Sequence, residues 1–406
     1  MKLFGQHGYG DGQKLRQGLD LGYIDGAIFS PKDIGRERLR GILDELAQSA
    51  PNAERLFDPQ YYATLVAAAT NSRCGSLITD YAAYFGIRRR AQLESETRVR
   101  DDLRDTMRFT RELNLTSVIT PSVVIPRSLN SIEAVVAKNF IRHAKDIGRE
   151  VGDTRPLLAT LAIGVEALRR HEELIEFLSD ITVMDDRPDG FYLLAATPSA
   201  DGRIDIFNSD TIAGWLFLNH ALSLNGFRVV NGYSDILTPF LGAAGASAGA
   251  TGWWSNLRSF SLNRFAPEST GGRLPVPRYL SCSLLNRITF DELERLRDAV
   301  PEVLNGLDTD ELYPVERGSE PERSQEVLQS WDAIRELNRR MVVESDVTES
   351  LAQCTTRVDE AAALYNEVQA ALFATLDPRS DSGHLEPLRD GLAKFAELAE
   401  LRAPEE

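Results

Sequence analysis

The chain has 406 residues, of which 43% are hydrophobic and 26% are charged, and its formal net charge is −16. This length is enough for one large domain with an appendage, or for two domains. The acidic balance excludes a protein that coats nucleic acid or anionic lipid over its whole surface, because such binding needs a positive field, but it allows a local cationic patch.

Short apolar runs alternate along the chain with longer stretches in which apolar residues recur every three or four positions. Several of the short runs are apolar on both alternating faces, as strands covered on both sides must be. The longer stretches predict amphipathic helices. The predicted strands cover residues 2–6, 25–30, 54–58, 117–120, 157–163, 190–196, 227–231 and 278–283, and the clearest helices cover 36–50, 131–152, 171–181 and 210–226.

Eight strands with intervening helices predict an α/β fold of the (β/α)8 barrel type. A doubly wound open sheet is the alternative, but the QHGYGDG sequence after the first strand lacks the G-x-G-x-x-G spacing of a dinucleotide site. We expect the barrel within residues 1–300, with a helical insertion at about 61–113. A helical extension is expected at 301–406, either packed on the barrel or mediating self-association or partner association.

The segment from residue 236 to 290 differs in charge from the rest of the chain. It contains five arginines and one acid, namely Arg258, Arg264, Arg273, Arg278, Arg287 and Glu268. Trp offers a flat stacking surface and Arg a planar fork for oxyanions, so the segment predicts a site for an anionic ligand with a ring, such as a nucleotide. The alternative for Arg258 and Arg264 is pairing with the acidic C-terminal helices.

A run of small residues, GAAGASAGATGWW, opens this segment. It is interpreted as a tightly packed helix against the barrel in preference to a direct ligand contact. The adjacent Trp253 and Trp254 cannot share one helix face, so one is expected to pack in the core while the other lines the site.

In barrels of this class the active site lies at the carboxyl ends of the strands, where three catalytic candidates stand. His7 could transfer protons because it titrates near neutrality, or it could simply bond a backbone carbonyl. Asp58 could form a pair of carboxylates with Asp33, or it could serve only in the turn that its DPQYY sequence predicts. Asp33 itself is better interpreted as a helix cap. Asp235 is either a helix cap or a carboxylate kept ionised by nearby arginines, available as nucleophile or base.

The predicted substrate-binding residues stand at the same strand ends or in the cationic segment. They are Gln6, Tyr9, Lys32, Gln60, Tyr61, Asn231, Tyr233, Trp253, Trp254, Arg258, Arg264 and Arg273.

Several motifs that mark other kinds of catalytic chemistry are absent from the sequence. The five histidines form no H-x-H or H-E-x-x-H pair, and the chain has no Walker loop, G-x-S-x-G elbow or catalytic-Cys signature. The sequence therefore predicts neither a metal ion nor a cofactor. Three dispersed cysteines, no signal-peptide pattern and no membrane span together predict a cytoplasmic protein without a membrane partner.

A barrel with strand-end carboxylates, an aromatic platform and arginines suits glycosidic-bond chemistry, in which a carboxylate stabilises or captures an oxocarbenium ion. If the leaving group is a nucleobase, Trp or Tyr stacking and Gln or Asn edge contacts also have a role. In architecture, residues 2 to about 297 resemble the barrel of tRNA-guanine transglycosylases and their DNA-modifying relatives. The resemblance implies an Asp nucleophile at a strand end, for which Asp235 and Asp58 are the possible counterparts.

The sequence thus predicts a nucleobase glycosylase or base-exchange enzyme acting on nucleic acid or a nucleotide. One alternative is a glycoside hydrolase or other carboxylate enzyme acting on a small anionic sugar. Another is a non-catalytic barrel subunit whose acidic helical tail docks a partner.

Overall fold

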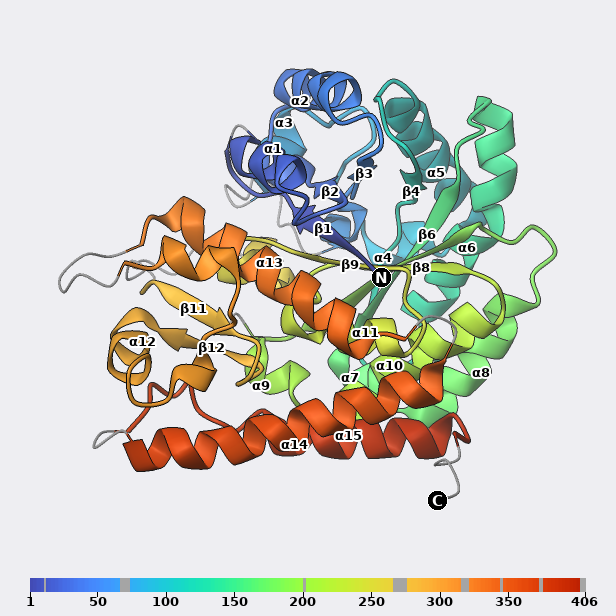
Figure 1. Cartoon of the computed structure of the whole chain (residues 1–406). Coiled ribbons are helices and arrows are strands. Elements are labelled where there is room, and N and C mark those ends of the chain that lie inside the picture. Colours follow the sequence, from blue (N-terminus) through green and yellow to red (C-terminus); the bar gives the residue numbers. More distant parts are fainter. Residues whose placement is uncertain are drawn as a thin grey trace.

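The computed structural model describes residues 1–401 except 11, 66–73, 200–201, 266–275, 315–320, 344–345 and 372–374. Its main body is a barrel of parallel strands surrounded by helices (Figure 1). No helix in the described part of the chain combines the length and the apolar character needed to span a membrane.

Eight parallel strands form the barrel, in the spatial order β3-β2-β1-β9-β8-β7-β6-β4. They are β1 (Lys2–Gln6), β2 (Gly26–Phe29), β3 (Glu54–Phe57), β4 (Val118–Ile119), β6 (Leu157–Gly164), β7 (Gly190–Thr197), β8 (Arg228–Asn231) and β9 (Ala248–Thr251). Between β3 and β4, the Thr116 amide donates to the Arg55 carbonyl at 3.0 Å, and the Arg55 amide donates to Thr116 Oγ1 at 3.0 Å. The barrel is therefore nearly closed, and the predicted α/β barrel fold is confirmed.

One helix follows each barrel strand on the outer side. These helices are α1 (Gln13–Asp20), α2 (Arg36–Ser49), α5 (Glu96–Arg111), α6 (Ile132–Val151), α8 (His171–Thr182), α10 (Ser209–Leu224), α11 (Thr238–Ala243) and α13 (Arg323–Met341). The four helices predicted most clearly agree with the structure to within two residues at each end. Helix α6 shows why: Ser131 Oγ accepts from the Ala134 amide at its start, and Gly152 ends it at a φ of 69°.

Strand β9 corrects two predictions. The predicted eighth strand at 278–283 is β11 (Arg278–Ser281), which pairs antiparallel with β12 (Asn286–Thr289) away from the barrel. The true eighth strand lies in the small-residue run that was predicted to be a helix. Its backbone bonds to β1 and β8, and Thr238 of α11 packs so closely on Gly249 that a Cβ there would meet it at 2.6 Å. The side chains of this run are small because neighbouring elements cover the strand closely. Pairing with β1 and β8 overrides the helix preference of alanine.

Helix α13 occupies the position of the eighth barrel helix, because it contacts α1, α11 and β1. Its Trp331 is fully buried and donates through Nε1 to the Thr251 carbonyl at 3.2 Å. Residues 252–322 therefore form the connection from the eighth strand to the eighth helix, and they leave the barrel at its carboxyl end. The predicted division of the chain at residue 300 stays a prediction.

This connection, which we call the β9–α13 connection, carries eight of the described elements outside the barrel. It holds η5 (Ser255–Leu257), β10 (Phe260–Ser261), η6 (Leu262–Phe265), β11, β12, α12 (Phe290–Leu296), η7 (Pro301–Val303) and η8 (Asp308–Leu312). Strand β10 pairs with the end of β7, so the connection begins on the rim of the barrel.

Two long helices complete the chain. Helix α15 (Leu385–Leu398) packs on α10, and α14 (Val347–Ala371) packs on α11 and α15, so both lie along one side of the barrel (Figure 1). The remaining short elements are η1 (Pro31–Asp33), η2 (Tyr61–Leu65), α3 (Ser76–Thr79), α4 (Arg90–Leu93), β5 (Val124–Ile125), α7 (Val165–Leu168), α9 (Arg203–Ile206) and η4 (Asp235–Leu237).

Candidate functional site

A buried polar network fills the centre of the barrel at the carboxyl ends of the strands. Asp58, which follows β3, is fully buried; its Oδ2 accepts from Tyr62 Oη at 2.7 Å and lies 3.4 Å from Tyr192 Oη. Its Oδ1 accepts from the Gln60 amide at 3.0 Å. Burial raises the pKa of Asp58 to about 6, although these hydrogen bonds and Arg264 hold it lower than burial alone would. Asp58 can therefore carry a proton near neutral pH.

Arg264 also belongs to this buried polar network. It arrives on η6 of the β9–α13 connection, and only 4% of its side chain is exposed. Its Nη1 donates to Tyr233 Oη at 3.0 Å and its Nη2 to Asp33 Oδ2 at 2.7 Å. Ser30 Oγ lies 3.4 Å from Tyr233 Oη and accepts from Gln6 Nε2 at 3.3 Å. Asp33 is thus the counter-ion of Arg264, and its interpretation as a helix cap is wrong, because the residue before α2 is Gly35.

Backbone strain concentrates around the barrel mouth. Among the described residues, five that are not glycine have a positive φ. Gln60 (51°) follows β3, Tyr233 (54°) and Asp235 (42°) follow β8, and Leu285 (50°) lies in the β11–β12 turn. Such conformations cost about 1 to 3 kcal/mol each and persist where the surroundings hold them, which is typical of functional sites.

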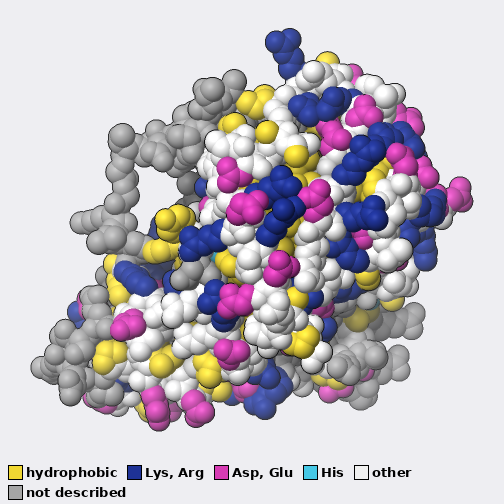
Figure 2. Space-filling model, turned by 90° about the horizontal axis from the view of Figure 1, so that it is seen from above, with side chains coloured by type: hydrophobic (Ala, Val, Ile, Leu, Met, Phe, Trp, Pro, Cys, Tyr) yellow, Lys and Arg dark blue, Asp and Glu magenta, His cyan; other side chains and the backbone are white. Residues whose placement is uncertain are grey.

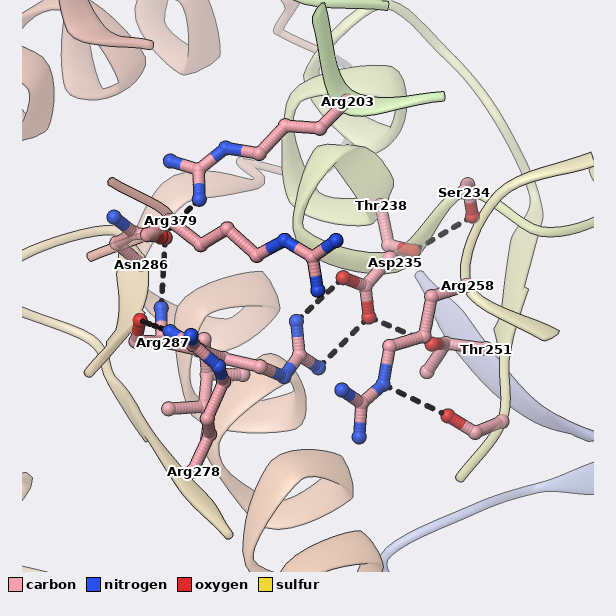
Figure 3. Close-up of polar contacts among 12 residues, drawn as sticks. Arg203, Ser234, Asp235, Thr238, Thr251, Arg258, Arg278, Asn286, Arg287 and Arg379 are labelled. Atoms are coloured by element: carbon pink, nitrogen blue, oxygen red, sulfur yellow. Dashed lines mark hydrogen bonds and ion pairs between the residues drawn. The ribbon is translucent and has the colours of Figure 1, made fainter. Parts of the chain in front are cut away.

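A cavity of about 200 Å³ lies between the barrel mouth and the β11–β12 hairpin. We call it the arginine cavity, because five arginines and one carboxylate line it: Arg203, Arg258, Arg278, Arg287, Arg379 and Asp235. Figure 3 shows the guanidinium groups of Arg287 and Arg379 turned toward Asp235, whereas that of Arg258 lies nearby and bonds a backbone carbonyl. Positive charge therefore surrounds a single acid in a partly enclosed space.

Asp235 is the most constrained side chain of this cavity. The two guanidinium nitrogens of Arg287 bind its two oxygens, with Nη2 at 2.8 Å from Oδ1, and Thr251 Oγ1 donates to Oδ1 at 2.7 Å. Burial would raise the pKa of Asp235, but Arg287 and Arg258 outweigh it and hold that pKa below its ordinary value. The carboxylate therefore stays ionised at neutral pH. It does not cap α11, which has no side-chain cap.

Arg258 joins the arginine cavity to helix α13. Its Nε donates to the Gly252 carbonyl at 3.2 Å, and its Nη2 donates to the Trp253 carbonyl at 3.3 Å and to Glu326 Oε1 at 3.0 Å. The expected alternative, pairing with the acidic C-terminal helices, is therefore realised for Arg258 even though Arg258 also lines the cavity. For Arg264 that alternative is wrong, since its partner is Asp33.

The charge balance of the arginine cavity differs from that of the open surface. Figure 2 shows basic and acidic side chains intermingled over the face that is uppermost in Figure 1. Surface ion pairs such as Arg36 with Glu112 at 2.9 Å and Arg149 with Asp186 at 2.8 Å link neighbouring elements. An excess of arginine over acid in a concave site favours an anionic ligand.

The two tryptophans separate as expected from their adjacency. Trp253 is buried and meets His7 edge-on with 5.8 Å between ring centroids, whereas 40% of Trp254 is exposed. The Lys14 ammonium lies 5.1 Å from the Trp253 ring and 6.0 Å from the Trp254 ring. The indole of Trp254 thus offers one face toward solvent beside a cation.

Other predicted residues are engaged inside the protein. His7 is buried with its ring 5.0 Å from Phe29, and the Lys32 amide donates to Gln60 Oε1 at 3.0 Å. Other contacts anchor barrel elements to outer helices: Tyr61 Oη donates to Asp102 of α5 at 2.5 Å, and Asn231 Oδ1 accepts from Trp215 Nε1 of α10 at 2.8 Å. Tyr9 stands in the loop after β1 with 83% of its surface exposed, and Arg273 lies outside the described residues.

Several site residues were missed by reading the sequence. Tyr62 and Tyr192 contact Asp58, and the DPQYY motif could have pointed to Tyr62. Arg203 and Arg379 reach the arginine cavity from α9 and from the loop before α15, and no local pattern marks either of them. Among the described residues no group of three or more His, Cys, Asp or Glu side chains could hold a metal ion.

Comparisons with known proteins leave the chain without an assigned family. No protein-family model and no curated protein matches it. Among solved structures, it is similar to a glycoside hydrolase family 3 β-N-acetylglucosaminidase from Paenibacillus sp. str. FPU-7, with a TM-score of 0.43 and 11% sequence identity over 98% of this chain and 67% of that chain. A likeness at this level carries no argument about function, which has to come from the site itself.

Proposed function

We propose that this barrel is a nucleobase glycosylase or base-exchange enzyme that acts on a phosphate-bearing substrate. The observation that carries the proposal is the ionised Asp235 carboxylate in a cavity lined by five arginines. Arginines bind phosphate through paired N–H donors, and a fixed carboxylate beside them meets the need of glycosidic-bond chemistry for a nucleophile. A strand-end Asp is also what the resemblance to the tRNA-guanine transglycosylase barrel implies.

The reaction uses Asp235 as the nucleophile. One carboxylate oxygen forms a bond to the anomeric carbon while the bond from that carbon to the base nitrogen breaks. The electron pair of the broken bond stays on the base nitrogen, which takes a proton from water. Water or an incoming base then attacks the same carbon and releases Asp235 as a free carboxylate. The proton that the attacking group loses neutralises the hydroxide left from the first step.

Arg287 and Thr251 position the nucleophile. The bidentate contact fixes the plane of the Asp235 carboxylate, and the Thr251 bond is directed at Oδ1. Arg287 also lowers the pKa of Asp235, which makes the carboxylate a better leaving group in the second step. Asp58 does not line the arginine cavity, and we assign it no contact with the substrate.

An assay of base release tests the proposal. The purified protein is incubated with nucleotides, single-stranded DNA and single-stranded RNA, and free base, base exchange and a covalent adduct are measured by mass spectrometry. Asp235→Asn should abolish base release and the adduct while the protein stays folded. The matched control is Asp180→Asn on α8, where 60% of the carboxylate side chain is exposed and pairs with Lys138; it should leave activity unchanged.

Three outcomes would count against this function. Full activity of folded Asp235→Asn would remove the residue from the mechanism. Turnover of free sugar phosphates without any nucleobase would favour the glycoside hydrolase alternative. Release of no base from any of the three substrates, with the protein folded, would favour a non-catalytic barrel.

A further inference from the structure

The exposed aromatic residues gather beside the arginine cavity. Within the described ranges, Tyr9 (83%) and Trp254 (40%) are the only aromatic side chains that are largely exposed. They come from the loops after the first and the eighth barrel strands, and both border one cavity of about 410 Å³. Single exposed apolar residues are ordinary on a protein surface, but the convergence of both rings on one cavity is not.

Trp254 links this cavity to the arginine cavity. It also borders a cavity of about 530 Å³, which shares Arg258, Arg278 and Arg379 with the arginine cavity. Ser255 borders all three cavities. The cavities therefore adjoin one another in a series from Tyr9, past Trp254, to Asp235. We call this series the aromatic track.

The aromatic track is cationic in its middle part. The 530 Å³ cavity is lined by five basic and two acidic side chains: Lys14, Arg258, Arg278, Arg323, Arg379, Glu326 and Asp377. Each acid is held by arginine, because Glu326 lies 3.0 Å from Arg258 and 3.2 Å from Arg323, while Asp377 lies 2.6 Å from Arg278. Acids held in this way reduce the positive field but do not reverse it, since the bases outnumber them.

We infer that the aromatic track binds single-stranded nucleic acid, which runs from Tyr9 across Trp254 into the arginine cavity. The inference rests on the proposed function, which places one nucleotide at Asp235. A free nucleotide would leave both exposed rings unused. A strand of several nucleotides can stack bases on Tyr9 and Trp254 while the basic side chains contact its phosphates, and every base offers a face for stacking. In a duplex these faces are covered by neighbouring bases, so the track should discriminate against it.

Fluorescence anisotropy of labelled oligonucleotides of about 12 nucleotides tests the inference. The Asp235→Asn protein is used, so that binding is measured without turnover, and DNA and RNA strands form separate arms. We expect tighter binding of either single strand than of duplex DNA. Trp254→Ala should weaken binding roughly 5- to 150-fold, and Tyr9→Ala should weaken it in the same direction. Trp254→Phe should retain most of the affinity because a ring remains.

One control variant and one variant of a basic residue separate stacking from general effects of the surface. Val183→Ala removes an apolar side chain that is 77% exposed at the end of α8, and it should leave binding unchanged. Arg323→Ala should lower the slope of log affinity against log salt by about 0.7, as expected for one lost phosphate contact to a single strand.

Equal or tighter binding of the duplex would overturn the inference. Unchanged affinity of both Trp254→Ala and Tyr9→Ala, or no binding at about 50 mM salt, would also overturn it. Failure of this inference is distinguishable from failure of the proposed function. Base release from free nucleotides without oligonucleotide binding would contradict this inference but support the proposed function. Tight binding of a single strand without base release would contradict the proposed function but support the aromatic track as a binding site.

Discussion

Replacing Asp58 by Asn should change how the stability of the protein depends on pH. The Asp58 carboxyl is fully buried, and burial raises its pKa from an ordinary 3.8 to about 6. The folded state therefore binds a proton more tightly at this position than the unfolded chain does. The stability that this proton provides is complete below pH 3.8 and is lost as the pH rises through 6.

The size of the effect follows from the pKa. A difference of one pKa unit corresponds to about 1.36 kcal/mol, so the rise from 3.8 to about 6 means that ionising Asp58 costs the folded state about 3 kcal/mol. Asn cannot ionise and keeps the shape of the neutral acid. Unfolding entropy is about 2.1 cal/mol/K per residue, which for 406 residues converts this cost into a shift in Tm of about 3 to 4 °C.

Calorimetry of the wild type and of Asp58→Asn between pH 4 and 8 measures this difference. The Tm of the variant minus that of the wild type should be most positive above pH 6 and should fall by about 3 to 4 °C toward pH 4. Asp235→Asn provides a contrast of opposite sign. The pKa of Asp235 is lowered against burial by Arg287 and Arg258, so its charge stabilises the fold above pH 3.8. That variant should be less stable than the wild type at neutral pH, with a deficit that shrinks in acid.

A Tm difference between Asp58→Asn and the wild type that does not change with pH would refute this reasoning. It would mean that Asp58 has the same proton affinity in the folded and unfolded states, through access to water or stronger hydrogen bonds to the ionised form. A difference that grows toward acid would show that Tyr62, the Gln60 amide and Arg264 together outweigh burial.

Three further predictions concern the barrel and the site. Trp331→Ala should lower the free energy of unfolding by about 3 to 5 kcal/mol in urea titrations, because the indole is fully buried. Gly164→Ala should lower Tm, since its Cβ would lie 2.0 Å from a backbone carbonyl, whereas Gly41→Ala in α2 meets nothing and should raise it. Arg287→Lys should reduce kcat in steady-state assays of base release, because one ammonium cannot hold both oxygens of Asp235.

Most of the barrel could be predicted because its strands carry a strong local signal. Strands β6 and β7 each have eight buried residues in a row, and their sequences, LLATLAIG and GFYLLAAT, are mostly apolar on both faces. Strand β9 could not be predicted in this way, because its AGAT sequence has no large apolar side chain. Its partner positions are set by β1 and β8, which lie far away in sequence.

The candidate site was predictable only where it is built from strand ends. Asp58 directly follows β3, and Asp235 lies in the short loop after β8, so the general position of active sites in barrels was enough to select them. Each acid also has a hydrogen-bond partner from elsewhere in the chain: Tyr192 of β7 contacts Asp58, and Arg287 of β12 contacts Asp235. Hydrogen bonds between segments so distant in sequence leave no periodic pattern to read.

The position of the β9–α13 connection explains how an acidic protein can hold a cationic site. The arginines of this connection divide between two places, with Arg264 in the barrel centre and Arg258, Arg278 and Arg287 around the arginine cavity. Arg264 pairs with Asp33 in the centre and Arg287 with Asp235 at the rim. Arg258 pairs with Glu326 of α13 instead, and Arg278 pairs with Asp377. The two barrel acids therefore anchor the connection, and the lining of the arginine cavity, with five arginines and one acid, gives the site its preference for anions.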